Sequence, residues 1–387
     1  MTSSIKDIFR SRTKEQIEVI MDYFKMPLKK SARKEDLLCE LSEYLHGDPS
    51  VWLRGLLEPD LKLLRVLCSA GPGETVAVLK PDFPTIIEVL QFVKSDEVDE
   101  KYVSLSLEPA MFEIVNPAID KVIAEKEADG SFEIERLVLG CLNIYGVLPL
   151  RTFVDSMFEG VSSEDKAMDL TSRISKCPLI RIYQEDYHGE FYIASPFVDN
   201  FSEILEMRKM TFKNLKKYAK MDRNSAIAAG TDSPFCYYGR NTEEGKTLEA
   251  MLSSIGYEGE ELRKALHTVW MSSQYAIDED ATEILFSPVT DKQDDIPSFE
   301  MYRDCIDTIV NYSNSIPKWL LKGQSSNKTG KMKLSIRVDD LSESYGVQSP
   351  YLQLFDMGFA VQPVPPDDPC PCGSGFAYRN CHGKHFS

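Results

Sequence analysis

The chain of 387 residues is 43% hydrophobic and 27% charged, which excludes a wholly disordered protein and allows about two to four folded domains. Its net charge of −17 repels nucleic acid and anionic lipid at long range unless basic groups cluster locally. No apolar run of about 18 residues occurs, and the first residues lack the apolar core of a signal peptide. We therefore expect no membrane span and a cytoplasmic location.

Six of the nine cysteines stand singly among apolar or helical neighbours. They are Cys39, Cys68, Cys141, Cys177, Cys236 and Cys305. This is the pattern of reduced core thiols rather than of a disulfide framework, and it again favours the cytoplasm.

Apolar residues recur at helical spacing along most of the chain, so we predict a mainly α, multidomain fold. We expect five parts: a helical hairpin at 1–48, a helical region at 49–128, a winged-helix-like module at 129–198, a helical domain at 199–365 with a mobile loop near 323–333, and a small zinc-binding tail at 366–387.

The sequence of residues 1–48 predicts two helices joined by a basic loop. Thr13 and Gln16 have the spacing of a capping box, Pro27 ends the helix that follows them, and leucines mark a second helix up to His46. The basic residues of the loop are Lys29, Lys30, Arg33 and Lys34. Residues 10–46 resemble the SAP-like fold that is also found at the N-terminus of Rho, and the resemblance implies nucleic-acid binding. The alternative is a helical hairpin whose basic side chains are simply solvated.

A second pattern, which begins after Asp129-Gly130, has the element order of a winged helix. It comprises helices over 134–145, 150–157 and 167–174, then β-like runs at 179–183 and 190–194 around Tyr187-His188-Gly189. In DNA-binding winged helices the third helix enters the major groove. Here residues 164–176 hold three acidic and three basic side chains. We therefore expect a packing module, with DNA binding as the less favoured interpretation.

We predict a helix over about residues 201–221, which is the most basic stretch of the sequence. Its basic residues are Arg208, Lys209, Lys213, Lys216, Lys217 and Lys220. Such a helix can follow a phosphate backbone or an acidic partner, or it can be one solvated helix face. Beyond it, the pattern predicts helices over 242–285 and 301–312 and a loop at 286–297.

The tail contains the one group of residues with clear chemistry. Cys370, Cys372, Cys381 and His382 lie within thirteen residues of each other. Three thiols and one imidazole supply the four donors of a tetrahedral structural zinc ion. The alternatives are a disulfide or an accidental cluster of thiols.

This tail resembles the SEC-C motif, the zinc module that ends SecA and many other bacterial proteins, with the pattern Cys-x-Cys-x8-Cys-[His/Cys]. The four residues above fall on its ligand positions, which implies one structural Zn²⁺; His385 is a spare imidazole outside that register. In that family a basic, aromatic face is linked to binding a chaperone, the ribosome or lipid. The interval 376–380 keeps aromatic residues but only one basic residue, Arg379. We therefore expect an apolar protein contact rather than an anionic partner.

We predict no catalytic residues. Four protein ligands leave the zinc ion no open position, and the sequence has no phosphate-cradling glycine loop, His-Glu-x-x-His pair or nucleophile elbow. The favoured function is a non-enzymatic, zinc-binding interaction or adaptor protein of the bacterial cytoplasm, with a protein partner at the tail. The alternative is a nucleic-acid-binding regulator that uses the hairpin, the winged-helix-like module and the basic helix, with weak, non-specific, salt-sensitive binding. An enzyme with an unrecognised site ranks third.

Overall fold

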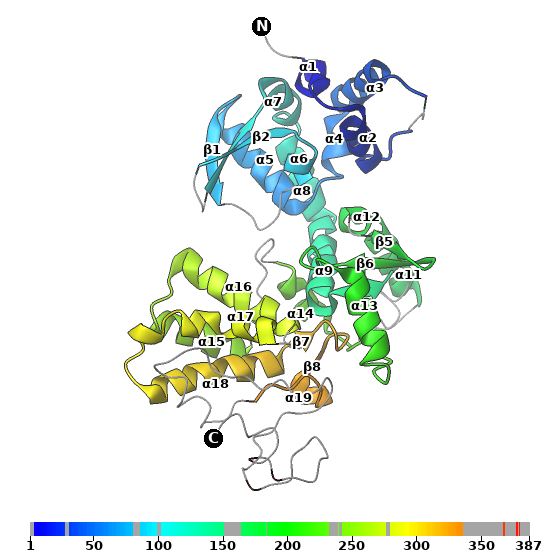
Figure 1. Ribbon diagram of the computed structural model, residues 1–387. Coiled ribbons are helices and arrows are strands. Elements are labelled where there is room, and N and C mark those ends of the chain that lie inside the picture. Colours follow the sequence, from blue (N-terminus) through cyan, green and yellow to red (C-terminus); the bar gives the residue numbers. More distant parts are fainter. Residues whose placement is uncertain are drawn as a thin grey trace. The chain divides into compact units, whose positions relative to one another are not determined.

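The computed structural model (Figure 1) describes residues 4–27, 31–79, 86–98, 102–150, 164–182, 184–231, 239, 242–275, 279–335, 367, 377 and 379. The fold is mainly helical with small sheets, as predicted. The chain forms two compact units. Unit 1 comprises Met1–Cys141, Pro149–Ile193 and Asp222–Phe235, and unit 2 comprises Leu142–Leu148, Ala194–Met221 and Cys236–Ser387. Among the described residues, none of the helices is both long enough and apolar enough to cross a bilayer.

Unit 1 begins with three short helices, α1 (Ile5–Arg10), α2 (Lys14–Tyr23) and α3 (Lys34–Gly47). The predicted capping box of α2 is confirmed, because the Gln16 N–H donates to Thr13 Oγ1 at 3.2 Å and the Thr13 N–H donates to Gln16 Oε1 at 2.9 Å. The apolar faces of α2 and α3 are buried, at Ile17, Ile20, Met21, Leu37, Leu38, Leu41 and Leu45. The two predicted helices are therefore present.

A three-stranded sheet lies in residues 75–107, where we predicted only helix. The elements here are α4 (Pro49–Leu53), α5 (Glu58–Ala70), β1 (Thr75–Leu79), α6 (Ile86–Val89), β2 (Val93–Glu97), β3 (Tyr102–Leu107), α7 (Pro109–Val115) and α8 (Ile119–Ala128). The strand order is β1-β3-β2, all antiparallel, with Val76 opposite Leu105 and Ser95 opposite the same residue. Val103, Leu105 and Leu107 of β3 are buried in alternation, and α5 packs against β1 and β3 (Figure 1). This period of two marks β3 as a half-buried strand.

The middle of the chain contains α9 (Ser131–Tyr145), β4 (Val147–Pro149), α11 (Glu164–Lys176), α12 (Pro178–Ile182), β5 (Gln184–Tyr187), β6 (Glu190–Ala194) and α14 (Arg223–Ala229). The predicted strand at 179–183 is wrong: those residues form α12, and the first strand of the hairpin starts at Gln184. Tyr187 pairs with Glu190 across a two-residue turn in which both His188 and Gly189 have positive φ, the geometry of a type I′ hairpin. Most of the predicted helix at 150–157 falls outside the described part of the chain.

Helices α9 and α14 of unit 1 meet at two glycines. A Cβ atom on Gly140 would lie 1.7 Å from the carbonyl oxygen of Ala226, and one on Gly230 would lie 1.9 Å from that of Arg136. The two backbones therefore approach so closely that neither position has room for a methyl group.

Unit 2 is built on α13 (Phe201–Met210), α15 (Glu243–Ser254), α16 (Gly259–Tyr275), α17 (Glu279–Thr290), η1 (Gln293–Asp295), α18 (Phe299–Ser315), β7 (Pro317–Lys318), β8 (Gln324–Ser325) and α19 (Ser326–Thr329). Helix α16 packs on α17, and α15 packs on α18. The rings of Trp270 and Tyr275 stand edge-on to Trp319, whose indole N–H donates to the carbonyl of Asn143 at 2.8 Å. The buried indole thus reaches both an aromatic core and a polar partner.

Three predictions for unit 2 need correction. Helix α17 continues through Pro288 to Thr290, into the segment that we predicted as a loop from 286. The predicted mobile loop at 323–333 contains β8 and α19. The predicted basic helix at 201–221 ends at Met210. It ends there because Phe212 and Ala219 are buried and the Ala219 N–H donates to the carbonyl of Lys322, so the chain follows the β7–β8 hairpin instead of continuing the helix.

The close approach of α9 and α14 predicts an unusual response to alanine. Gly140→Ala should lower the free energy of unfolding by about 1–3 kcal/mol, because the added methyl group forces two backbones apart. This loss should appear although alanine is the better helix former by about 1 kcal/mol. Gly47→Ala, at the end of α3 with open space around its Cβ position, is the matched control and should be neutral or stabilising. Chemical denaturation measures both; equal effects of the two substitutions would contradict the packing described here.

Candidate functional site

The four predicted zinc ligands, Cys370, Cys372, Cys381 and His382, lie outside the described residues. Within the described ranges, no group of three or more His, Cys, Asp or Glu side chains is placed to hold a metal ion. In the tail, Arg379 forms an ion pair with Asp367. The pair brings together the two ends of segment 367–379, which contains the first two cysteines and stops two positions before the third. The donors themselves, three thiols and one imidazole, are the set that a tetrahedral structural zinc ion takes.

The predicted basic loop of the N-terminal hairpin is only partly described. Lys29 and Lys30 fall in the gap between residues 27 and 31. Arg33 is exposed, and its N–H donates to Asp36 Oδ2 at 3.2 Å. Lys34 Nζ donates to the carbonyl oxygen of Arg10 at 2.7 Å, so this ammonium group ties the start of α3 to the end of α1. Of the two described residues, Arg33 is therefore the one that points its charge into solvent.

The predicted basic stretch separates into one buried residue and several exposed ones. Arg208 is only 4% exposed, and its guanidinium donates to the carbonyl oxygens of Val147 at 2.6 Å, Tyr145 at 2.6 Å and Trp319 at 3.0 Å. Arg208 acts as an internal clamp, because its side chain links α13 to residues 145–147 and to Trp319. The remaining members are all exposed: Lys209, Lys213, Lys216, Lys217 and Lys220.

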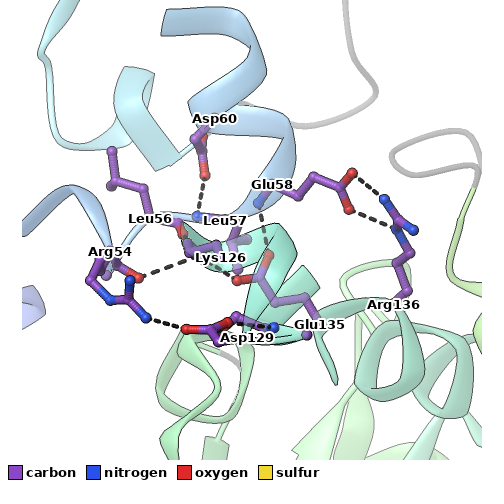
Figure 2. A network of polar contacts seen from close by, with 12 residues as sticks. Arg54, Leu56, Leu57, Glu58, Asp60, Lys126, Asp129, Glu135 and Arg136 are labelled. Carbon is purple, nitrogen blue, oxygen red and sulfur yellow. Dashed lines mark hydrogen bonds and ion pairs between the residues drawn. The ribbon is translucent and has the colours of Figure 1, made fainter. Parts of the chain in front are cut away.

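Sequence reasoning missed a buried network of charges in unit 1 (Figure 2). Lys126, 2% exposed, donates to Glu135 Oε1 at 2.6 Å, to the Leu56 carbonyl at 2.6 Å and to the Arg54 carbonyl at 3.3 Å. The other oxygen of Glu135 accepts the N–H of Glu58 at 2.7 Å. The Lys126 ammonium thus donates hydrogen bonds to two carbonyls of the turn after α4. The Glu135 carboxylate accepts a hydrogen bond from the first N–H of α5.

Three further ion pairs extend this network. The carboxylate of Glu58 accepts from Arg136 Nε at 2.8 Å, and Arg54 pairs with Glu125 at 3.1 Å and with Asp129. No local motif predicts these contacts, because the partners are separated by 71 to 78 positions in the sequence. The one signal was the presence of charged residues next to apolar helix faces, which is too common to be decisive.

Asp60 lies beside the network and is almost fully buried. Its carboxyl oxygens accept the backbone N–H groups of Ile87 and Leu57, both at 3.3 Å. Burial raises the pKa of Asp60 to about 7, with nearby Glu135 adding to the rise, so this carboxyl holds its proton in mildly acidic solution. Burial also raises the pKa of Glu135, while the adjacent Lys126 ammonium limits that rise.

A cavity of about 410 Å³ opens beside the network within unit 1 and is lined in part by Arg54, Lys126, Asp129, Arg173 and Cys177. Three of the cations on its wall have partners: Arg173 Nη2 donates to the carbonyls of Asp129 and Gly130 at 3.0 Å, and Arg54 and Lys126 are paired as described. Lys176, which also lines the cavity, is exposed. Burial raises the pKa of the Cys177 thiol to about 12. This thiol is therefore not an activated nucleophile at neutral pH.

A comparison with protein families finds the SEC-C motif at residues 368–384, as the sequence predicted. The match spans all four predicted ligands and the interval between them. Comparison with curated proteins and with solved structures gives no match. The chain therefore carries a SEC-C motif at its tail, a zinc-binding type of module.

The buried Lys126–Glu135 pair predicts a large cost for removing one partner. Lys126→Met should lower the free energy of unfolding by about 3–5 kcal/mol, because Glu135 would be left buried without its cation and two carbonyls would lose a donor. Lys126→Met combined with Glu135→Gln should recover part of the loss, since the uncompensated charge is then removed.

The control is Lys121→Met, which breaks the exposed Lys121–Glu125 pair at 3.8 Å and should change stability by less than about 1 kcal/mol. Urea denaturation measures all three variants. A loss for Lys126→Met no greater than that for Lys121→Met would show that the network does not hold α4, α5, α8 and α9 together.

Proposed function

We propose that this protein is a non-enzymatic, zinc-binding interaction protein whose SEC-C tail contacts a protein partner. The observation that carries the proposal is the SEC-C match at residues 368–384, with Cys370, Cys372, Cys381 and His382 on its ligand positions. The buried, reduced thiols of Cys141 and Cys177 are in keeping with a cytoplasmic location.

One zinc ion would be held by those three cysteines and the histidine. Bound there, it would cross-link a segment with few apolar side chains, which cannot offset the entropy of ordering its own backbone. The thiols would bind as thiolates, so the affinity should fall in acid. Because all four positions of a tetrahedral ion would be filled by protein atoms, the role is structural rather than catalytic.

The chemistry of the tail supports a protein partner over an anionic one. Its interval between the second and third cysteines contains Phe376 and Tyr378 but only one basic residue, Arg379. That guanidinium is paired with Asp367, which neutralises its charge locally. Aromatic side chains are enriched at protein–protein contacts, so an apolar patch is the better fit to this composition.

The second candidate function is nucleic-acid binding. The exposed lysines of residues 209–220 favour it, whereas the described part of the N-terminal hairpin offers Arg33 and a tethered Lys34. The two functions use different parts of the chain and are compatible with each other.

The zinc proposal predicts one zinc ion per chain in protein purified without chelator. X-ray absorption should show three sulfur ligands at about 2.3 Å and one nitrogen ligand. Cys370→Ser combined with Cys372→Ser should abolish zinc binding and leave the main thermal transition unchanged, because the ion orders the tail alone. The same double variant should fail to capture the partner that the unaltered chain captures in a pull-down.

Cys39→Ser is the matched control, since this half-buried thiol lies in α3 and should leave zinc content and capture unchanged. Purified protein without zinc would refute the metal assignment. Zinc-loaded protein whose partners are the same with and without the tail cysteines would refute the adaptor role.

A further inference from the structure

Two segments of unit 2 are basic and contain no acidic residue, in a chain whose net charge is −17. Residues 208–221 hold six basic side chains, and residues 316–335 hold five lysines. The first segment stood out in the sequence. The second did not, because it is more than ninety positions further along the chain and looks like a polar loop.

The structure places these two segments side by side. The Ala219 N–H donates to the carbonyl oxygen of Lys322 at 2.9 Å, and Gln324 Nε2 donates to that of Lys217 at 3.1 Å. Lys322 Nζ also reaches the Lys216 carbonyl at 3.5 Å. The Arg208 clamp, which belongs to the first segment, holds the carbonyl of Trp319 in the second. One backbone hydrogen bond and three side-chain bonds to backbone carbonyls, including that of Arg208, therefore fix the contact between the segments.

Most of their lysines reach solvent. Lys213, Lys216, Lys217 and Lys328 are exposed, and Lys322 and Lys331 are half-buried, with Lys331 Nζ 5.7 Å from the centre of the Phe212 ring. Burial and the positive charge of Arg208 lower the pKa of Lys322, as expected where cations are crowded. Lys318 is not part of this surface, since it is buried and donates to the Ser273 carbonyl at 2.6 Å.

We propose that Lys213, Lys216, Lys217, Lys322, Lys328 and Lys331 form a basic surface that binds the phosphate backbone of nucleic acid without reading its sequence. Lysine is a point charge suited to phosphate oxygens, and the amide of the exposed Asn327 at the same place is of a type that commonly donates to phosphate. Each phosphate neutralised releases a counterion, which supplies the driving force against the negative charge of the rest of the chain.

Nucleic acid fits this surface better than an acidic protein does. The cores of protein–protein interfaces are depleted in lysine and depend on large apolar or aromatic anchors. In the described part of these two segments, Met210 is the single large apolar side chain that is strongly exposed, at 75%. This surface deepens the second candidate function, on which it rests, and it is independent of the adaptor function and of zinc.

Matched charge reversals test the proposal in the full-length protein. One variant combines Lys216→Glu with Lys217→Glu on the first segment, and a second combines Lys328→Glu with Lys331→Glu on the other. The control combines Lys246→Glu with Lys264→Glu, two exposed lysines of α15 and α16. All three variants change the net charge equally and alter unit 2 only. Circular dichroism checks that each one folds.

Fluorescence anisotropy with labelled DNA of about 16 nucleotides, single-stranded and duplex, gives the affinity between about 50 mM and about 200 mM salt. We expect binding at the low salt with a log–log slope near −4.5 on duplex, for about five phosphates neutralised. Each segment variant should bind at least about tenfold more weakly, with a slope smaller by up to about 1.8. The control, and the variant that lacks Cys370 and Cys372, should bind as the unaltered protein does.

Three results would overturn the proposal. The first is no binding by the unaltered protein at the low salt. The second is an equal loss of affinity in the control with Lys246→Glu and Lys264→Glu, which would show that the binding depends on the net charge of the protein rather than on this surface. The third is tighter binding of a polyglutamate peptide of similar length through the same lysines, which would identify an acidic protein as the partner.

Discussion

Unit 2 depends on the contacts of one buried guanidinium. Arg208 lies in the last turn of α13, next to the exposed Lys209. It donates to the carbonyls of Tyr145, Val147 and Trp319. Tyr145 is the last residue of α9, so its carbonyl is one that the helix cannot satisfy internally and that favours a positive charge. Leaving such buried carbonyls without a donor costs about 1–3 kcal/mol each. Arg208 therefore fixes the point at which residues 208–221 leave α13, and it places them against the β7–β8 hairpin.

In unit 1 buried charged side chains also bind backbone groups of neighbouring segments, but there the cation Lys126 is paired with the carboxylate Glu135. Lys126 and Glu135 satisfy the turn after α4 and the start of α5, so polar groups that would be costly to bury become the link between four helices. In both units the buried cations are structural and point away from solvent. The residues proposed to bind ligands are different ones: lysines of unit 2 that reach solvent for nucleic acid, and the cysteines and histidine of the tail for zinc.

Local patterns predicted much of the helical fold and the tail. The capping box of Thr13 and Gln16 and the apolar stripe of α9 are visible in neighbouring residues, and both are confirmed. The predicted hairpin around Tyr187-His188-Gly189 is present, but its first strand starts at Gln184 rather than at residue 179. The sheet β1-β3-β2 was missed although β3 alternates in the sequence, because its neighbour β2 is a polar strand with no alternation of its own. The end of α13 and the pairing of segments 208–221 and 316–335 could not be predicted, since both depend on bonds between residues about one hundred positions apart. The SEC-C tail was predictable because its ligands are neighbours in the sequence.

The central claim is that Arg208 holds the two basic segments together. Hydrogen–deuterium exchange of Arg208→Met and the unaltered protein, read for the peptides that contain Ala219 and Gln324, tests it most directly. We predict faster exchange at Ala219, whose N–H bonds to Lys322, and around Gln324, with α16 retaining its protection. Unchanged exchange in both segments would contradict the claim, because the hairpin and the lysine segment would then hold together without the clamp.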